Sequence, residues 1–348
     1  MDVTLGDFFS DPALFLFELD QETAIFQTMT RENFARSIFL DGRIRHGNAP
    51  NFRVPMDVLL KASQSTPGVA PPTGWIFHVA QCGSTLLARA LDHIGRSLVL
   101  REPMVLRRLG VAASGGTVDG RVDGHLSSML RLTLAMLGKR WDPATPVIVK
   151  ANVPVNFIAR EVMEANPDCP AILLYFPLES YVAAILRTEG HVRWTEGVFD
   201  ELRLSGSPLA AHQVPDSAAT KAAALWFAQM KAYAGILADF PAARSLDAAT
   251  FFARPAETID AAAALFGVPL RPGEAEAIVA GELFHSYSKN PALDYDPEVR
   301  AVREIEARRR LADPIAEAVE WARRAGEIHG LPVAFDKSIL GESPALLP

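Results

Sequence analysis

Apolar residues along the chain gather in short runs, and the stretches between these runs carry a helical pattern. The runs have the length of strands and few polar positions, which is typical of parallel strands buried on both faces. This alternation predicts an α/β fold in which helices cover both faces of a central parallel sheet. The apolar runs are 75–80, 97–100, 147–151, 171–176 and 244–246, and the helical patterns are 125–138, 154–165, 179–188, 217–239 and 255–266.

The parts of the chain outside this alternation suggest a division into three segments. Residues 1–62 mix short apolar stretches with an amphipathic piece, and we expect them to form an N-terminal extension that packs on the core. Residues 63–74 are rich in proline and glycine, which is typical of a connector. Residues 75–340 are expected to form one α/β domain.

Composition limits the classes of function. The chain has 348 residues, of which 49% are hydrophobic, so it can bury a large core. Its net charge of −7 argues against a general nucleic-acid binder, and any anion site must be local. The two cysteines exclude a disulfide scaffold.

The chain start lacks a signal peptide's pattern, and no apolar run approaches the ~20 residues of a membrane helix. We expect a soluble, cytoplasmic protein with no membrane or nucleic-acid partner and no metal, because the histidines show no metal spacing.

The run 75–80 ends at a turn centred on Gly83, and a helix opened by Ser84 and Thr85 follows. Free N–H groups at a helix start, with the positive end of the helix dipole behind them, bind anions. Gly83 would let the backbone approach an oxyanion. The turn lacks the lysine of a Walker A loop, so a nucleoside-triphosphate kinase is disfavoured. The pattern therefore predicts an anion cradle, and the alternative is an ordinary turn capped by Ser84.

The segment Ala80-Gln-Cys-Gly-Ser-Thr-Leu-Leu87 resembles the 5′-phosphosulfate loop of the sulfotransferases, approximately Pro-Lys/Arg-Ser-Gly-Ser/Thr-Thr-x-Leu. The resemblance implies a P-loop-like fold and 3′-phosphoadenosine 5′-phosphosulfate as the co-substrate. Gln81 stands where the family has a cation, so it offers a hydrogen bond without positive charge. The implied donor contacts come from Gln81, Cys82, Gly83, Ser84, Thr85 and Leu86.

Two charged residues end predicted strands, where ligands bind in parallel α/β sheets. Glu102 lies 19 residues after Gly83, and it resembles the glutamate that removes the acceptor's proton in the tyrosylprotein branch of the family. A carboxylate beside a desolvated anion site has a raised pKa, which suits a general base. Lys150 resembles a lysine that follows a strand in many sulfotransferases. The alternatives are that Glu102 caps a helix or pairs with Arg101 or Arg107, and that Lys150 is a surface lysine.

The segment 171–187 resembles the family's 3′-phosphate segment, a strand followed by Arg-Asp-Pro and, six residues after the proline, a serine. Pro177 matches, but Tyr175, Phe176 and Ala183 replace the arginine, aspartate and serine. Arg187 is the expected substitute for the phosphate contact, with Ser180 and Arg193 as alternatives. The run 226–269 resembles a later part of these enzymes, so the resemblance covers about 75–270 in order.

Together these features predict transfer of a sulfuryl group from an adenylyl phosphosulfate donor to a hydroxyl or amine of a small-molecule or peptide acceptor. Glu102 and Lys150 are the expected catalytic residues. Two alternatives stay open. One is a transferase or hydrolase that uses another phosphorylated ligand in the same cradle. The other is a non-catalytic relic of the fold that binds a small anion or a partner.

Overall fold

A computed structural model of the chain describes residues 3–44, 50–65, 71–114, 124–204, 216–287, 290–294, 297–341 and 343–348. The predicted α/β class is confirmed, since a five-stranded parallel sheet is flanked by helices. Its hydrogen-bonded order is β5-β6-β4-β7-β8, which is 2-3-1-4-5 when the five strands are numbered along the chain. The strand before the glycine turn is therefore central. The strands are β4 (Gly74–His78), β5 (Leu98–Arg101), β6 (Val147–Lys150), β7 (Ala171–Tyr175) and β8 (Ala243–Asp247).

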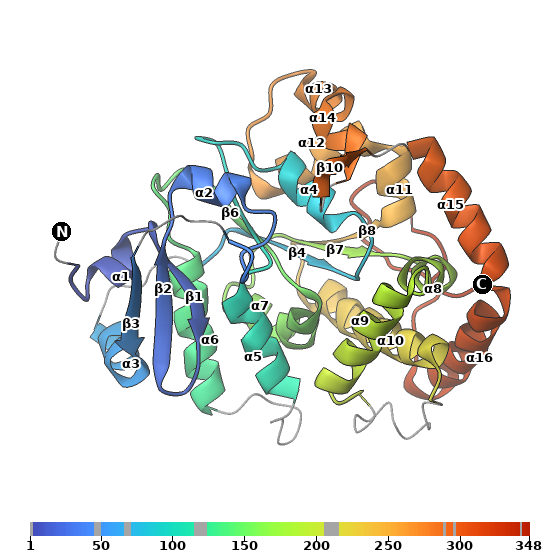
Figure 1. The fold of residues 1–348 in the computed structure, drawn as a ribbon, viewed down its shortest axis with the longest axis horizontal. Helices are drawn as coiled ribbons and strands as arrows, with labels where there is room; N and C mark the ends of the chain where they lie inside the picture. Colours follow the sequence, from blue (N-terminus) through green and yellow to red (C-terminus); the bar gives the residue numbers. More distant parts are fainter. Residues whose placement is uncertain are drawn as a thin grey trace. The chain divides into compact units, whose positions relative to one another are not determined.

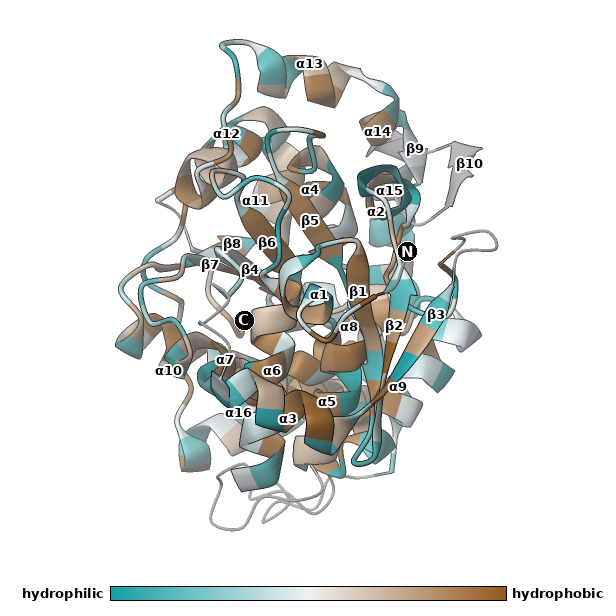
Figure 2. Cartoon of the chain, turned by 90° about the vertical axis from the view of Figure 1, so that its left-hand side faces the viewer, coloured by the Kyte–Doolittle hydropathy of each residue, from teal (hydrophilic) through white to brown (hydrophobic). Residues whose placement is uncertain are grey.

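The first four of these strands are buried along their whole length. Both faces of each strand therefore need apolar side chains, which is why the sequence shows continuous apolar runs rather than alternation. Figure 2 shows β5 and β6 largely in the brown of hydrophobic residues. Polar residues appear where strands end, at Arg101 and Lys150, and these end positions carry the candidate chemistry.

The chain forms two compact units. The first consists of Met1–Phe77, Leu87–Ala171 and Ala262–Leu270, and the second of His78–Leu86, Ile172–Ala261 and Arg271–Pro348. Glu102 and Lys150 belong to the first unit, whereas the glycine turn and Arg187 belong to the second. The expected division of the chain at residues 62 and 74 remains a prediction.

The first unit contains an antiparallel sheet in the order β1-β2-β3, formed by Leu14–Leu19, Thr23–Thr28 and Asn51–Pro55. These strands lie side by side in blue in Figure 1, and β1 packs on α5 and α6. The helical elements of this unit are α1 (Asp7–Ser10), α2 (Arg31–Arg36), α3 (Met56–Ser65), α5 (Met104–Ser114), α6 (Gly124–Leu137), the 3₁₀ helix η1 (Val153–Ile158) and α7 (Ala159–Glu164).

Two buried cations tie the N-terminal segment to the rest of the first unit. The Lys139 ammonium donates hydrogen bonds to the carbonyl oxygens of Phe8 (2.8 Å) and Leu14 (2.5 Å). The Arg101 guanidinium donates to the carbonyl oxygens of Phe34, Ala35 and Ser37 at the C-terminal end of α2. Cations favour helix C-termini, where carbonyl groups lack partners inside the helix.

The second unit is mainly helical around β7 and β8. Its long helix α10 (Ala218–Asp239) packs on α8 (Leu178–Ile185), α9 (Glu189–Glu201) and α16 (Ala312–His329), as Figure 1 shows. The remaining elements include α11 (Ala248–Ala253), α13 (Glu274–Ala280), α14 (Glu282–His285), a β9–β10 ribbon (Ser286–Tyr287 and Asn290–Asp294) and α15 (Pro297–Arg310). Helices α4 (Ser84–Ala90) and α12 (Pro255–Phe266) contribute residues to both units. Within the described ranges, no helix combines the length and apolarity needed to cross a membrane.

Candidate functional site

Glu102 and Lys150 form an ion pair at the carboxyl ends of β5 and β6. The two strands are parallel with Arg101 opposite Lys150, so Glu102 comes directly after the paired residues. The Lys150 side chain is 0% exposed and that of Glu102 is 22% exposed, so the carboxylate is the part of the pair that solvent reaches. The alternative of a surface lysine is therefore wrong. Glu102 also does not pair with Arg101, whose partner is Asp92.

The backbone at Glu102 is held in an unusual conformation. Its φ is +53°, in the left-handed region that side chains rarely adopt. Its N–H donates to the Lys150 carbonyl at 2.7 Å. Leu40 forms backbone hydrogen bonds with residues on either side of Glu102. The Leu40 N–H donates to the Arg101 carbonyl, and the Leu40 carbonyl accepts from the Met104 N–H. Such strain persists only where the surroundings impose it, and it concentrates at functional sites.

The N-terminal segment supplies two further residues at this cluster. The Lys150 Nζ lies 5.5 Å from the centroid of the Phe39 ring, and the Arg43 Cζ lies 4.2 Å from the same centroid. Arg43 also forms a hydrogen-bonded ion pair with Asp41. This hydrogen bond is the main cause that raises the pKa of the Arg43 guanidinium, and the charges of Asp41 and Glu102 act in the same direction. Sequence reasoning assigned no site residue to this segment.

Asn152 is a second residue that the sequence analysis missed. It lies two positions after Lys150, between β6 and η1, and it is 7% exposed. Its Oδ1 is buried and has no hydrogen-bond partner in the described part of the chain. The available signal was its place just beyond a strand end, where functional residues gather in parallel sheets.

The glycine turn lies in the second unit, directly before α4. Gln81 and Gly83 both have left-handed φ angles, +65° and +83°. A Cβ on Gly83 would lie 2.7 Å from Cζ of Phe252 and 3.2 Å from Cε1 of Phe251. Gly83 is thus required by its φ and by the phenylalanine beside it. The sequence analysis expected the glycine to make room for an oxyanion, and the missing side chain faces an aromatic ring instead.

The side chains that follow Gln81 are buried. The Cys82 thiol donates to the Val79 carbonyl at 2.8 Å, so it serves as a small packed residue. The Thr85 hydroxyl has a buried Oγ1 without a hydrogen-bond partner among the residues that the structure describes. Ser84 and Leu86 are buried beside it. A buried hydroxyl without a partner can bond to a ligand oxygen. The Thr85 hydroxyl is therefore the group in this segment that suits a phosphosulfate.

Arg187 lies just beyond the C-terminal end of α8. Pro177 precedes α8 at the end of β7, whereas Arg187 follows the other end of this eight-residue helix, about 12 Å away. Arg187 lines a cavity of about 540 Å³ together with Arg193 and Arg310. The Arg310 guanidinium donates to the Arg187 carbonyl at 2.6 Å.

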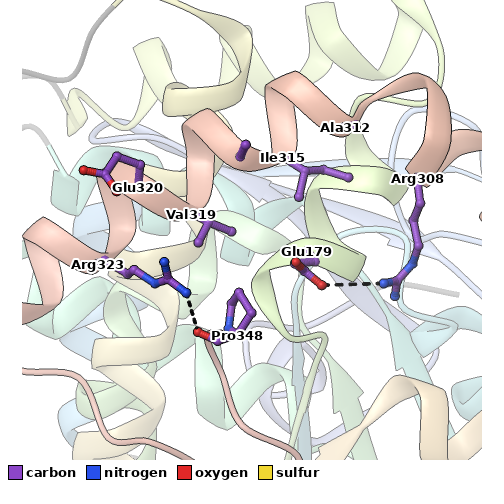
Figure 3. Close-up of a pocket in the computed structure, with 9 residues that line it drawn as sticks. Glu179, Arg308, Ala312, Ile315, Val319, Glu320, Arg323 and Pro348 are labelled. Atoms are coloured by element: carbon purple, nitrogen blue, oxygen red, sulfur yellow. Dashed lines mark hydrogen bonds and ion pairs between the residues drawn. The ribbon is translucent and has the colours of Figure 1, made fainter.

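Tyr175, at the position of the arginine in the resemblance, is buried, and Ser180, an alternative phosphate contact, is already hydrogen-bonded. Tyr175 is buried in edge contact with Phe335 at 4.9 Å, and burial raises the pKa of its hydroxyl. Ser180 accepts a hydrogen bond from Arg308 at 2.6 Å. Arg308 and Glu179 form an ion pair at one end of a cavity of about 700 Å³, and Arg323 binds the Pro348 carbonyl at the other (Figure 3). This second cavity contains none of the predicted site residues.

The structure therefore joins Glu102 to Lys150 in the first unit. It places residues 81–86 in the turn before α4 and the start of that helix, in the second unit, with Arg187 beyond α8. Within the residues that the structure describes, no group of three or more histidine, cysteine, aspartate or glutamate residues could hold a metal ion.

Comparisons with known proteins add two structural similarities. No protein-family model and no curated protein matches the chain. The crystal structure of a sulfotransferase from Alicyclobacillus acidocaldarius is 15% identical with a TM-score of 0.41, and the match covers 75% of this chain and 97% of that one. The sulfotransferase domain from the curacin biosynthetic pathway is 11% identical with a TM-score of 0.39, and the match covers 76% of this chain and 99% of that domain.

Proposed function

We propose that the chain is a sulfotransferase-like enzyme that moves a sulfuryl group from 3′-phosphoadenosine 5′-phosphosulfate to an acceptor hydroxyl or amine. The observation that carries the proposal is the buried hydroxyl of Thr85, at the start of α4 in the segment that resembles the phosphosulfate loop, which has no hydrogen-bond partner among the described residues. The Glu102–Lys150 pair at two strand ends supports the proposal, since it supplies a buried cation and a carboxylate that can accept a proton. The glutamate is the feature that resembles the tyrosylprotein branch.

The residues divide into donor contacts and groups that act on the acceptor. Gln81, Ser84, Thr85 and the amides of the turn would hold the 5′-phosphosulfate, and Arg187 would contact the 3′-phosphate. Glu102 would take the proton from the acceptor while Lys150 offsets negative charge. In the reaction, the acceptor oxygen or nitrogen forms a bond to sulfur. The bond between sulfur and the bridging phosphate oxygen breaks, and the leaving group is 3′,5′-adenosine bisphosphate.

Calorimetric titration with 3′,5′-adenosine bisphosphate, AMP and ATP tests the proposal. Selective binding of the bisphosphate is expected. Preference for ATP would instead favour a transferase or hydrolase that uses another phosphorylated ligand.

Substituting Thr85 by valine keeps the side-chain shape and removes the hydroxyl. We expect this variant to bind the bisphosphate roughly tenfold to a hundredfold more weakly, because a hydrogen bond to a charged group is worth about 1.5–3 kcal/mol. Thr133 in α6 also has a buried hydroxyl without a partner in the described ranges, so Thr133→Val is the matched control and should bind normally.

A second candidate is a non-catalytic relic of the same fold, and the burial of Tyr175 favours it. The arginine expected at that position would supply charge to the 3′-phosphate, whereas Tyr175 packs on Phe335 in the core. Absence of binding for all three nucleotides would support this candidate over both enzymes.

A further inference from the structure

The side-chain amide of Asn152 has no evident role in the fold. Asn152 occupies the N-cap position of η1, yet its side chain makes no capping hydrogen bond. Its Oδ1 is buried and finds no donor anywhere in the described ranges. Leaving a buried acceptor unsatisfied destabilises a protein, so the unsatisfied Asn152 oxygen calls for an explanation.

The position of Asn152 relates it to the Glu102–Lys150 pair. The chain is extended at Asn152, with φ −96° and ψ 164°, and the Ala151 N–H still donates to the Ile76 carbonyl. Residues two apart in an extended chain share a face, so Asn152 lies on the face of Lys150. From the strand spacing and the rise per residue, the Cα atoms of Asn152 and Glu102 are about 6 Å apart.

This cluster therefore offers two hydrogen-bond acceptors, the Glu102 carboxylate and the Asn152 amide oxygen. Lys150 is a donor and is already directed at Glu102. An acceptor with a single hydroxyl group has one proton, and Glu102 takes it. Such an acceptor therefore has no second donor for the Asn152 oxygen. A neutral primary amine has two N–H groups, and a vicinal diol has two O–H groups.

We propose that Asn152 is a specificity-determining residue that accepts a hydrogen bond from a second donor on the acceptor, and that the acceptor is a primary amine or a vicinal diol. The inference rests on the proposed sulfuryl transfer. The proton on the attacking nitrogen or oxygen goes to Glu102, the bond to sulfur forms, and 3′,5′-adenosine bisphosphate leaves. The second N–H or O–H stays bonded to the Asn152 oxygen throughout.

The first test measures stability and needs no acceptor. Asn152→Leu removes the unsatisfied oxygen and puts an apolar group of similar size in its place, so its melting temperature should equal or exceed that of the wild type. Asn156 lies four residues after Asn152, is 1% exposed and interacts with other groups of the protein. Asn156→Leu should therefore be less stable than the wild type. A loss of stability in Asn152→Leu equal to that in Asn156→Leu would show a structural amide and overturn the proposal.

The second test compares phenol, aniline and catechol as acceptors of similar size. Phenol presents one donor, aniline two on one nitrogen, and catechol two on adjacent oxygens. We expect kcat/KM to be higher for aniline or catechol than for phenol, and the preferred compound identifies the acceptor chemistry. Asn152→Leu should lower kcat/KM for the preferred compound, mainly through KM, by at least ten times the factor by which it lowers kcat/KM for phenol. Preference for phenol, or an equal loss on all three compounds, would overturn the proposal.

Binding of 3′,5′-adenosine bisphosphate separates the two hypotheses. Asn152→Leu should bind it as the wild type does. If the wild type does not bind the bisphosphate, sulfuryl transfer fails as the function, and the proposal about the acceptor fails with it. If the wild type binds it and the acceptor preference is absent, the proposal about Asn152 fails alone.

Discussion

The ring of Phe252 lies where a side chain on Gly83 would begin, with Cζ 2.7 Å from the position of a Cβ. Gly83 also has a φ of +83°, so an alanine there meets both backbone strain and a steric clash. The turn that resembles a phosphosulfate loop is thus shaped by its packing as well as by its expected ligand.

Gly83→Ala should therefore lower the free energy of unfolding by roughly 2–4 kcal/mol, measured by urea denaturation. Gly95→Ala is the matched control, because Gly95 has a φ of +82° and no atom within 4 Å of its Cβ position. The control should lose only about 1–2 kcal/mol. Equal losses in the two variants would show that Phe252 does not constrain the turn.

Glu102→Gln tests the proposed general base. The amide keeps the shape of the side chain but cannot take the acceptor's proton, so turnover should fall by about 10²–10⁴-fold. The dissociation constant of 3′,5′-adenosine bisphosphate should stay unchanged. Glu164, an exposed glutamate paired with Arg160, provides the control, and Glu164→Gln should keep full turnover. An active Glu102→Gln enzyme would remove Glu102 from the mechanism.

The two partners of the ion pair should differ in their effect on stability. Glu102→Ala leaves the Lys150 ammonium charged and fully buried, whereas Lys150→Met leaves a carboxylate that solvent still reaches. Removing one partner from a buried charge pair is destabilising by about 3–5 kcal/mol, and this range applies to Glu102→Ala. We expect about 1 kcal/mol for Lys150→Met, because solvent screens the remaining charge. Thermal and urea unfolding of both variants measure the difference, and a larger loss in Lys150→Met would contradict it.

Lys139 should make stability depend on pH. Burial lowers the pKa of its ammonium from 10.5 to about 7 in the folded chain. Between these values the unfolded chain binds a proton that the folded chain lacks, so stability rises with pH across this window. From pH 7 to pH 9 the gain should be about 2 kcal/mol. The free energy of unfolding at both pH values, compared with that of Lys139→Met, isolates this group. A wild type and variant with the same pH dependence would refute the expected titration.

The strands of the parallel sheet were predictable because their burial on both faces leaves continuous apolar runs, as in Ala171–Tyr175. The boundaries of the helices were harder to predict from the sequence. The pattern over 179–188 continues into a second helix, since the Thr188 side chain accepts from the His191 N–H and caps α9. The pattern over 154–165 begins as a 3₁₀ helix that contains Pro154.

The candidate site was partly predictable for a similar reason. Glu102 and Lys150 stand out because each ends a strand, but their pairing depends on the register of β5 and β6. Phe39 and Arg43 reach the pair from a segment about 60 residues earlier than Glu102, and no local pattern marks them. Asn152 is identified by a missing hydrogen bond, which only a structure can show.

The hydrogen bonds from Arg101 to the end of α2 make the N-terminal residues part of the framework that holds the proposed base. Arg101 immediately precedes Glu102, and its guanidinium is shared between Asp92 and the carbonyl groups of Phe34, Ala35 and Ser37. A shortened chain without α2 would leave a buried cation with most of its acceptors gone, beside the backbone that sets the angle of Glu102. The N-terminal segment is therefore not a detachable module, and grafting the α/β core onto another N-terminus would have to recreate this helix end.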